Sequence, residues 1–136
     1  MTQEELQQKY AKLQLLDQQI KKVQTQLQTL TNHLTELSHS LESLDEFKQV
    51  KTGTEILVPI VTGIFAKAEL KDVKSLNVNV GSNVSTSKTL DESKQILQEQ
   101  FQELENIRIR LSNDAQKMIA QAQLLQQDIM AAQQQS

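Results

Sequence analysis

Two long segments of this chain, one at each end, carry apolar residues at alternating spacings of three and four. The first runs over residues 6–44 and the second over residues 90–132, and all three glycines and the only proline lie between them. The repeat averages 3.5 residues, which keeps an apolar stripe facing a partner only if helices supercoil. The sequence therefore predicts two long helices of nearly equal length that form a coiled coil.

The apolar seam is regular in the first helix and thinner in the second. Only Lys9 interrupts the a and d positions of the first helix, whereas Lys94 and Arg108 stand at a positions of the second. The stems of such residues can lie on the seam while their charged ends reach water. Thr89 or Ser87 is placed to cap the start of the second helix.

Matching helix lengths favour pairing within one chain. With the bend midway, opposed residues lie about equally far from the two ends, which sets Leu13 near Leu124 and Leu34 near Glu103 and Leu104. The alternative is a parallel dimer through one helix, and heptads alone leave it open.

Between the helices the apolar period changes from 3.5 to 2. Leu76, Val78 and Val80 alternate with asparagines, as in a half-buried strand. Pro59 cannot donate to a strand ladder, so its strand is expected at a sheet edge or at a bulge. Four short strands are predicted, over residues 55–60, 64–71, 75–80 and 84–88.

Strands of this number and size cannot bury both faces alone. An exposed apolar edge also invites pairing with another chain. We therefore expect the strands to assemble with other subunits. The candidate assembly residues are Ile56, Val58, Ile60, Ile64, Phe65, Leu70, Leu76, Val78, Val80 and Val84.

The predicted fold class is α+β, a long antiparallel coiled-coil helical hairpin with two β-hairpins at the bend. Residues 1–50 form the N-terminal coiled-coil helix, residues 51–88 the four-stranded assembly module and residues 89–136 the C-terminal coiled-coil helix. Such a chain offers no obvious pocket, so its function is expected to lie on its surface and at its ends.

The composition argues against several classes of function. A net charge of −3 opposes nucleic-acid binding, and the absence of cysteine excludes disulfides and thiolate sites. The longest apolar run, residues 56–61, is far shorter than the roughly 20 residues that cross a bilayer. The sequence shows no nucleophile with a base, no metal set and no phosphate loop. We expect a cytoplasmic protein that is not an enzyme, uses no cofactor or metal, and binds neither nucleic acid nor membrane.

The central stretch carries the most specific motif. It reads LVPIVTGIFAKAEL at residues 57–70 and NVGSNVSTSKTLDES at residues 79–93. Val-Pro, a glycine and an apolar strand are followed by a Val-Gly turn and by Lys-Thr-Leu-Asp-Glu, which opens the second helix. This pattern, with helices on both sides, resembles the alpha-class subunits of the prefoldin family. Two hairpins favour that class, because beta-class subunits have one.

The resemblance implies a hexamer of two alpha-class and four beta-class subunits. The strands would complete an oligomeric β-barrel platform from which six coiled coils project. It further implies an ATP-independent holdase that captures unfolded polypeptides between the coil tips and delivers them to a group II chaperonin. The alternative is a coiled-coil scaffold or tether with fixed protein partners, which explains the heptads but not the four strands that interrupt them.

Apolar residues outside the seam are unevenly distributed. The first helix has none over residues 21–46, whereas the outer parts of both helices carry Tyr10, Leu15, Ile119, Leu124 and Met130. Fraying of the open ends would add the seam residues Leu6, Leu13, Leu16, Leu125 and Ile129. These residues are the candidate client-binding tips. The alternative is that they are ordinary surface residues, since single exposed apolar side chains are common.

Overall fold

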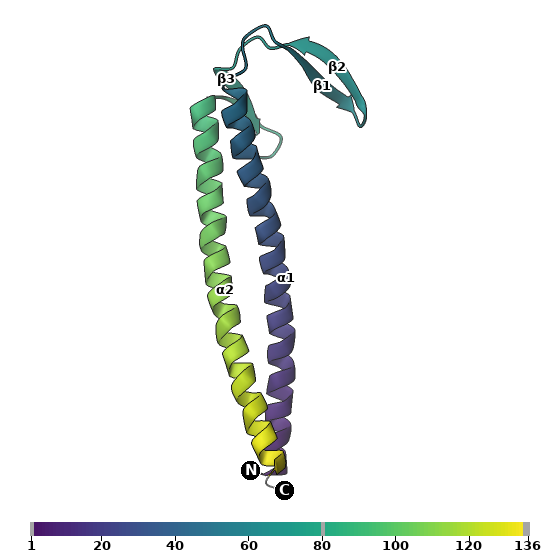
Figure 1. The fold of residues 1–136 in the computed structure, drawn as a ribbon, viewed down its shortest axis with the longest axis vertical. Helices are drawn as coiled ribbons and strands as arrows, with labels where there is room; N and C mark the ends of the chain where they lie inside the picture. The colour runs from purple at the N-terminus through teal and green to yellow at the C-terminus, as the bar shows by residue number, and fades with distance from the viewer. Residues whose placement is uncertain (1, 80, 135–136) are drawn as a thin grey trace. The chain divides into compact units, whose positions relative to one another are not determined.

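The computed structural model describes residues 2–79 and 81–134. Its elements are α1 (Gln3–Phe47), β1 (Glu55–Val61), β2 (Ile64–Glu69), β3 (Ser75–Asn79), β4 (Ser85–Thr89) and α2 (Leu90–Gln134) (Figure 1). Both helices have 45 residues. The predicted order of helix, two β-hairpins and helix is therefore confirmed.

The predicted seam of α1 is the buried side of that helix. Every a and d residue from Leu6 to Leu44 is buried or half-buried, including Lys9. Phe47, at the end of α1, is the one half-buried side chain of this helix outside those positions. The remaining described positions of α1 are exposed and mostly polar. The 3.5-residue period thus identified the packed face correctly.

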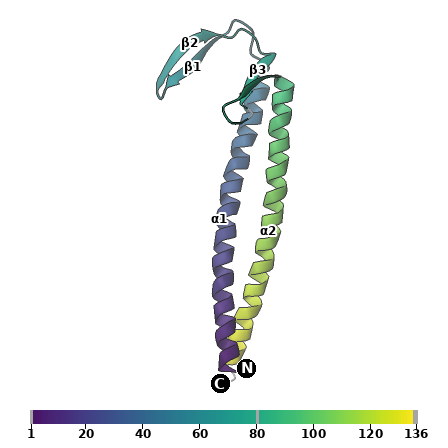
Figure 2. The ribbon, with the colours of Figure 1, turned by 180° about the vertical axis from the view of Figure 1, so that it is seen from behind.

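The chain forms two compact units, and the first pairs the outer parts of the helices. It comprises Met1–Leu34 and Glu103–Ser136. Within it, α1 and α2 lie side by side in both views (Figures 1 and 2). Leu16, Ala122 and Ile129 are buried between them. The Lys9 Nζ atom lies 2.9 Å from the Asp128 Oδ2 atom, and these residues are equally far from the two ends, as the predicted antiparallel pairing requires.

The second unit, Thr35–Gln102, contains both β-hairpins and the adjoining helix segments. Leu37 of α1, Leu90 of α2 and Leu70, just after β2, are buried in it. The Lys94 Nζ atom donates a hydrogen bond of 2.7 Å to Asp45 Oδ1 across the two helix segments. This unit therefore shows the same antiparallel pairing as the first.

The strands form two separate two-stranded antiparallel sheets. In β1–β2, Glu55 lies opposite Glu69 and Pro59 opposite Phe65, and the register shifts between Pro59 and Val61. The strand of Pro59 was expected at a sheet edge or at a bulge, and it has both, since each strand of a two-stranded sheet is an edge. Gly63, with a φ of 85°, closes this hairpin in the left-handed region that glycine adopts without strain.

Several strand ends differ from the prediction by one or two residues: β1 ends at Val61 and β4 at Thr89, each one residue later than predicted, and bonds outside the ladders accompany the shifts at the end of β2 and the start of β4. β2 stops at Glu69, and the Leu70 N–H bonds instead to the Thr54 carbonyl at 2.9 Å. The Val84 N–H bonds to the Gly81 carbonyl at 2.9 Å, so β4 begins one residue later than predicted. Val80, a predicted strand and assembly residue, lies outside the described residues.

Candidate functional site

Five of the six exposed large apolar side chains on the described helices lie in the outer coil, as predicted, and the sixth is Ile109 in the inner half of α2. Leu15, Leu124 and Met130 are 54%, 61% and 60% exposed, and Tyr10 and Ile119 are exposed as well. By contrast, the apolar residues of α1 over residues 21–46 are all buried or half-buried. The structure thus separates an apolar outer surface from a polar inner stretch of α1. We call the five exposed residues the tip cluster. Their role in client binding stays a prediction.

The seam residues predicted to join them are packed between the helices. Leu16 and Ile129 are buried, and Leu6, Leu13 and Leu125 are half-buried. These five side chains would become fully exposed only if the coil opened.

A capping box begins α1 and was missed by the sequence reasoning. The Glu5 N–H bonds to Thr2 Oγ1 at 3.2 Å, and the Thr2 N–H bonds to Glu5 Oε2 at 3.3 Å. The Thr-x-x-Glu spacing of residues 2–5 is the signal that could have revealed it. The start of the coil is therefore held by its own side chains.

Polar contacts also join the two helices at this end. Lys9 donates to Asp128, and the Gln133 amide donates to the Tyr10 hydroxyl. Tyr10 is nevertheless 44% exposed. Tyr10 therefore presents an apolar surface while its hydroxyl is held in place.

Each of the three seam cations has a carboxylate partner. Lys9 pairs with Asp128 and Lys94 with Asp45. Arg108 bonds within its own helix, and its Nε donates to Glu105 Oε2 at 2.9 Å. Hydrogen bonding to Arg108 lowers the pKa of Glu105, aided by the guanidinium charge and opposed by desolvation. The same bond raises the pKa of Arg108, so both groups keep their charges at neutral pH.

The β1–β2 hairpin presents a second exposed apolar surface. Val58, Ile60, Ile64 and Phe65, all predicted assembly residues, are exposed there, and Ile56 is half-buried. Leu57 and Val61 are also exposed, at 62% and 56%. The sequence reasoning left these two out, although the unbroken apolar run over residues 56–61 could have indicated them.

The β3–β4 hairpin places its apolar side chains differently. Leu76 and Val78 are half-buried, and with Leu44, Ile96 and Leu97 they line a groove of about 470 Å³ beside the coil. Of the other predicted assembly residues, Leu70 is buried and Val84 is exposed. Whether these residues contact other subunits stays a prediction.

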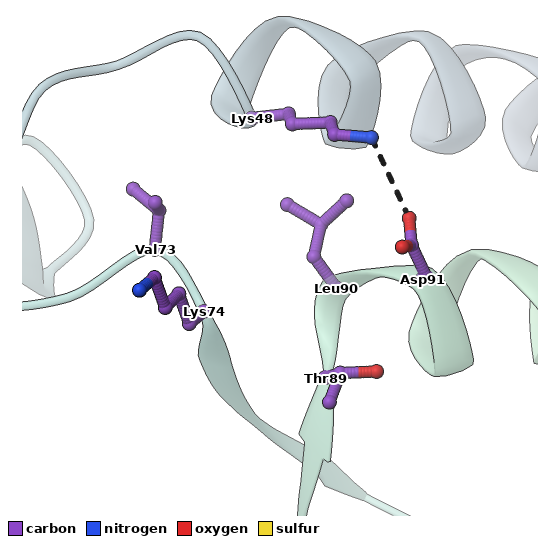
Figure 3. A pocket seen from close by; sticks show the side chains of 6 residues that line it. All are labelled: Lys48, Val73, Lys74, Thr89, Leu90 and Asp91. Carbon is purple, nitrogen blue, oxygen red and sulfur yellow. Dashed lines mark ion pairs between the residues drawn. The ribbon is translucent and has the colours of Figure 1, made fainter.

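A pocket of about 410 Å³ lies where α2 begins. It is lined by Lys48, Val73, Lys74, Thr89, Leu90 and Asp91 (Figure 3). The Lys48 Nζ atom lies 3.7 Å from Asp91 Oδ1, and Thr89 caps the helix through its bond to the Glu92 N–H. The ion pair links the residue after α1 to the first turn of α2, and the cap fixes the start of α2, so both contacts have a structural role in the second unit.

Among the described residues there is no group of three or more His, Cys, Asp and Glu side chains that could hold a metal ion. No helix in the described part of the chain is long and apolar enough to cross a membrane.

Known proteins match this chain over nearly its whole length. The family model described as "Prefoldin subunit" matches residues 16–135. A prefoldin subunit alpha of Archaeoglobus fulgidus is 29% identical over 133 residues, which cover 98% of this chain and 97% of that protein. A prefoldin subunit alpha of Methanococcus maripaludis is 32% identical over 114 residues, covering 84% of this chain and 77% of that protein.

A solved structure has the same fold. It is the cryo-EM structure of filamentous PFD from Methanocaldococcus jannaschii, with a TM-score of 0.77 and 19% identity. The match covers 88% of this chain and 98% of that one. Family model, relatives and fold agree with the motif of the central strands, and the chain therefore belongs to the prefoldin family, as a subunit of the alpha class.

Proposed function

We propose that this subunit works in a cytoplasmic, ATP-independent holdase that captures unfolded polypeptides and delivers them to a group II chaperonin. Family membership makes the chain a prefoldin chaperone subunit that assembles with other prefoldin subunits. The assembly would be a hexamer of two alpha-class and four beta-class subunits built on a barrel of strands. The subunit would have a binding role without catalysis.

The observation that carries the capture step is the contrast between the tip cluster and the inner stretch of α1. The tip cluster exposes large apolar side chains, whereas the apolar residues of α1 over residues 21–46 are covered. Exposed leucine and methionine side chains form adaptable contacts that tolerate many partner sequences. In the proposal, residues 1–50 and 89–136 supply the capturing coil, and residues 51–88 hold the assembly together.

Assembly is supported by the β1–β2 hairpin. A two-stranded sheet with apolar residues on exposed positions is marginal in water and prone to aggregation. Coverage by neighbouring strands would remove Val58, Ile60 and Ile64 from solvent. A barrel built from several such hairpins achieves this without leaving sheet edges.

The capture step is tested by replacing four tip residues in the assembled chaperone. The variant Y10S/L15S/L124S/M130S should assemble as the parent does but should lose most of its ability to suppress aggregation of a denatured protein without ATP. Light scattering measures the suppression, and native mass spectrometry measures assembly. The matched control Q19S/Q26S/E36S/Q116S introduces the same number of serines at exposed polar positions and should keep full suppression.

Equal suppression by the tip variant and the control would contradict capture by the tip cluster. A protein that only tethered fixed partners would give a different result, because it would fail to suppress aggregation of unrelated denatured proteins.

Transfer to the chaperonin is tested separately, by following a labelled denatured protein from the holdase to a group II chaperonin in a mixing experiment. Failure of the label to move would contradict delivery.

A further inference from the structure

The tip cluster is divided between two sides of the outer coil. In an antiparallel helix pair, the e positions of the heptads flank the seam on one side and the g positions on the other. Tyr10 and Gln133 each directly follow a d residue and are therefore e residues. The hydrogen bond from the Gln133 amide to the Tyr10 hydroxyl joins the two e positions across the coil. Tyr10 thus marks one side of the outer coil.

Leu15 and Leu124 lie on the opposite side. Both are c residues, and a c residue is the neighbour of the g residue three positions before it on the helix surface. Lys12 is a g residue, and it lines a cavity of about 280 Å³ together with Leu125 of the facing helix. The other residues around this cavity are Glu5, Gln8 and Lys9. We call this surface the lysine side, formed by the c and g positions over residues 2–22 and 114–134.

Two carboxylates of the lysine side are already compensated. Asp128 pairs with Lys9. The Glu5 carboxylate accepts the Thr2 N–H at the start of α1, where the helix dipole favours negative charge. Neither carboxylate therefore needs a further cation.

The remaining charges of the lysine side are mostly positive. They are Lys12, Lys22, Lys117 and Asp114, and none of them belongs to an ion pair within the described part of the chain. The opposite side, formed by the e and b positions over the same ranges, carries one aspartate and one lysine, Asp17 and Lys21. The lysine side thus has an excess of uncompensated positive charge, whereas the side of Tyr10 is balanced.

The two exposed leucines lie between two of these lysines along the coil. The register set by the cross-helix ion pair of the outer coil places Leu124 level with residue 13 and Lys117 level with residue 20. Lys12 and Lys117 are therefore about 12 Å apart along the coil axis at the usual rise of a helix, with Leu15 and Leu124 between them. Four residues of an extended chain cover nearly the same length, roughly 13 Å, and alternate side chains point to the same side. One extended segment can therefore reach both lysines and the leucines between them.

We propose that the lysine side selects client segments in which an apolar residue stands between two acidic residues, each two positions away from it. The apolar side chain contacts Leu15 and Leu124, and the two carboxylates lie beside Lys12 and Lys117. The leucines accept any apolar side chain, whereas the two ammonium groups distinguish acidic from neutral segments. This inference rests on the proposed capture of unfolded polypeptides and adds the class of segment that one side of the coil prefers.

The test compares two fluorescently labelled, unstructured peptides on the assembled chaperone. One contains Ser-Asp-Val-Leu-Val-Asp-Ser, and the other has asparagine in place of both aspartates. Fluorescence anisotropy should give the aspartate peptide a Kd about three- to fivefold lower than that of the asparagine peptide, as expected for ion pairs that stay partly exposed. This preference should shrink as the salt concentration rises.

Matched variants assign the preference to the lysine side. K12Q should reduce the preference at least about twofold and leave the Kd of the asparagine peptide unchanged. The control K21Q removes the same charge from an exposed position on the opposite side and should keep the preference of the parent. K12E should reduce the preference further than K12Q. L15S/L124S should raise the Kd of both peptides, because both use the apolar contact.

Equal affinity of the parent for the two peptides would overturn the inference and leave the proposed function intact. An unchanged preference in K12Q would also overturn it, because the selection would then lie elsewhere in the assembly. So would an equal loss in K12Q and K21Q, since that result would assign the preference to the net charge of the coil. Failure of the parent to bind either peptide and to suppress aggregation would instead contradict the proposed function.

Discussion

Thr89 ends strand β4 and caps the start of helix α2. Its hydroxyl accepts from the Glu92 N–H at 3.1 Å, and the Glu92 carboxylate accepts from the Thr89 N–H at 3.3 Å. The sequence left Ser87 as an alternative cap. Ser87 instead stays in the ladder opposite Asn77, and its hydroxyl pairs with that of Ser75 at 2.7 Å. The strand register therefore makes Thr89 the helix cap, although the local sequence made Thr89 and Ser87 equally suitable for that role.

We expect T89A to lower the free energy of unfolding by about 1 kcal/mol, because the Glu92 N–H loses its side-chain acceptor. Urea unfolding followed by circular dichroism measures the change. The control is T29A, at an exposed position inside α1 where the hydroxyl bonds only to the Thr25 carbonyl. Alanine favours helix there, so T29A should be neutral or slightly stabilising. Equal effects of the two substitutions would argue against the cap.

The helices show how a seam accommodates charge. Lys9 and Lys94 each reach a carboxylate of the facing helix segment, whereas Arg108 is satisfied within α2. Heptad spacing located all three cations but could not name their partners, because the partners depend on the register between two segments far apart in sequence. Of the three cations, Lys9 is the best site for testing the stability of the outer coil, because it lies beside the tip cluster.

At the level of the helix pair, K9L should tighten the outer end of the coil. Leucine would restore an apolar d position, which outweighs the loss of a partly exposed ion pair and adds about 1 kcal/mol of stability. Hydrogen exchange of the first two turns of α1 should slow. K12L introduces the same residue at an exposed position and should leave exchange unchanged. Faster or equal exchange in K9L would show that the ion pair with Asp128 contributes more than the leucine.

For the whole molecule, the heptads allowed either a hairpin or a parallel dimer. Each compact unit contains an antiparallel cross-helix ion pair, Lys9 with Asp128 in one and Lys94 with Asp45 in the other. In a parallel dimer through one helix, these opposite halves of the chain would not face each other. The pairing within one chain also leaves the apolar strands of the middle free for other subunits.

Cross-linking tests this arrangement, because the chain has no cysteine of its own. The double variants K9C/D128C and D45C/K94C, treated with a short bismaleimide, should each form a link within one chain and keep the subunit mass on a denaturing gel. The corresponding single-cysteine variants should stay unlinked. A band of twice the subunit mass from the double variants would favour pairing between chains.

Much of the fold and part of the candidate site could be predicted from local patterns. The 3.5-residue period identified the buried side of α1, the alternation of period two located the strands, and the missing N–H of Pro59 indicated the bulge. The exposed tip cluster followed from counting apolar residues outside the seam. Each of these features depends on residues that are close together in the chain, so the sequence alone determined them.

Only the tertiary structure decided how the two hairpins use their apolar residues. Leu76 and Val78 line a groove beside the coil, whereas Leu57 and Phe65 stay exposed on a face that also opposes Glu55 to Glu69. Alternation alone cannot distinguish these outcomes, because it gives the two sides of a strand but not what covers each side. That depends on turns, on the strand register and on contacts between segments far apart in sequence.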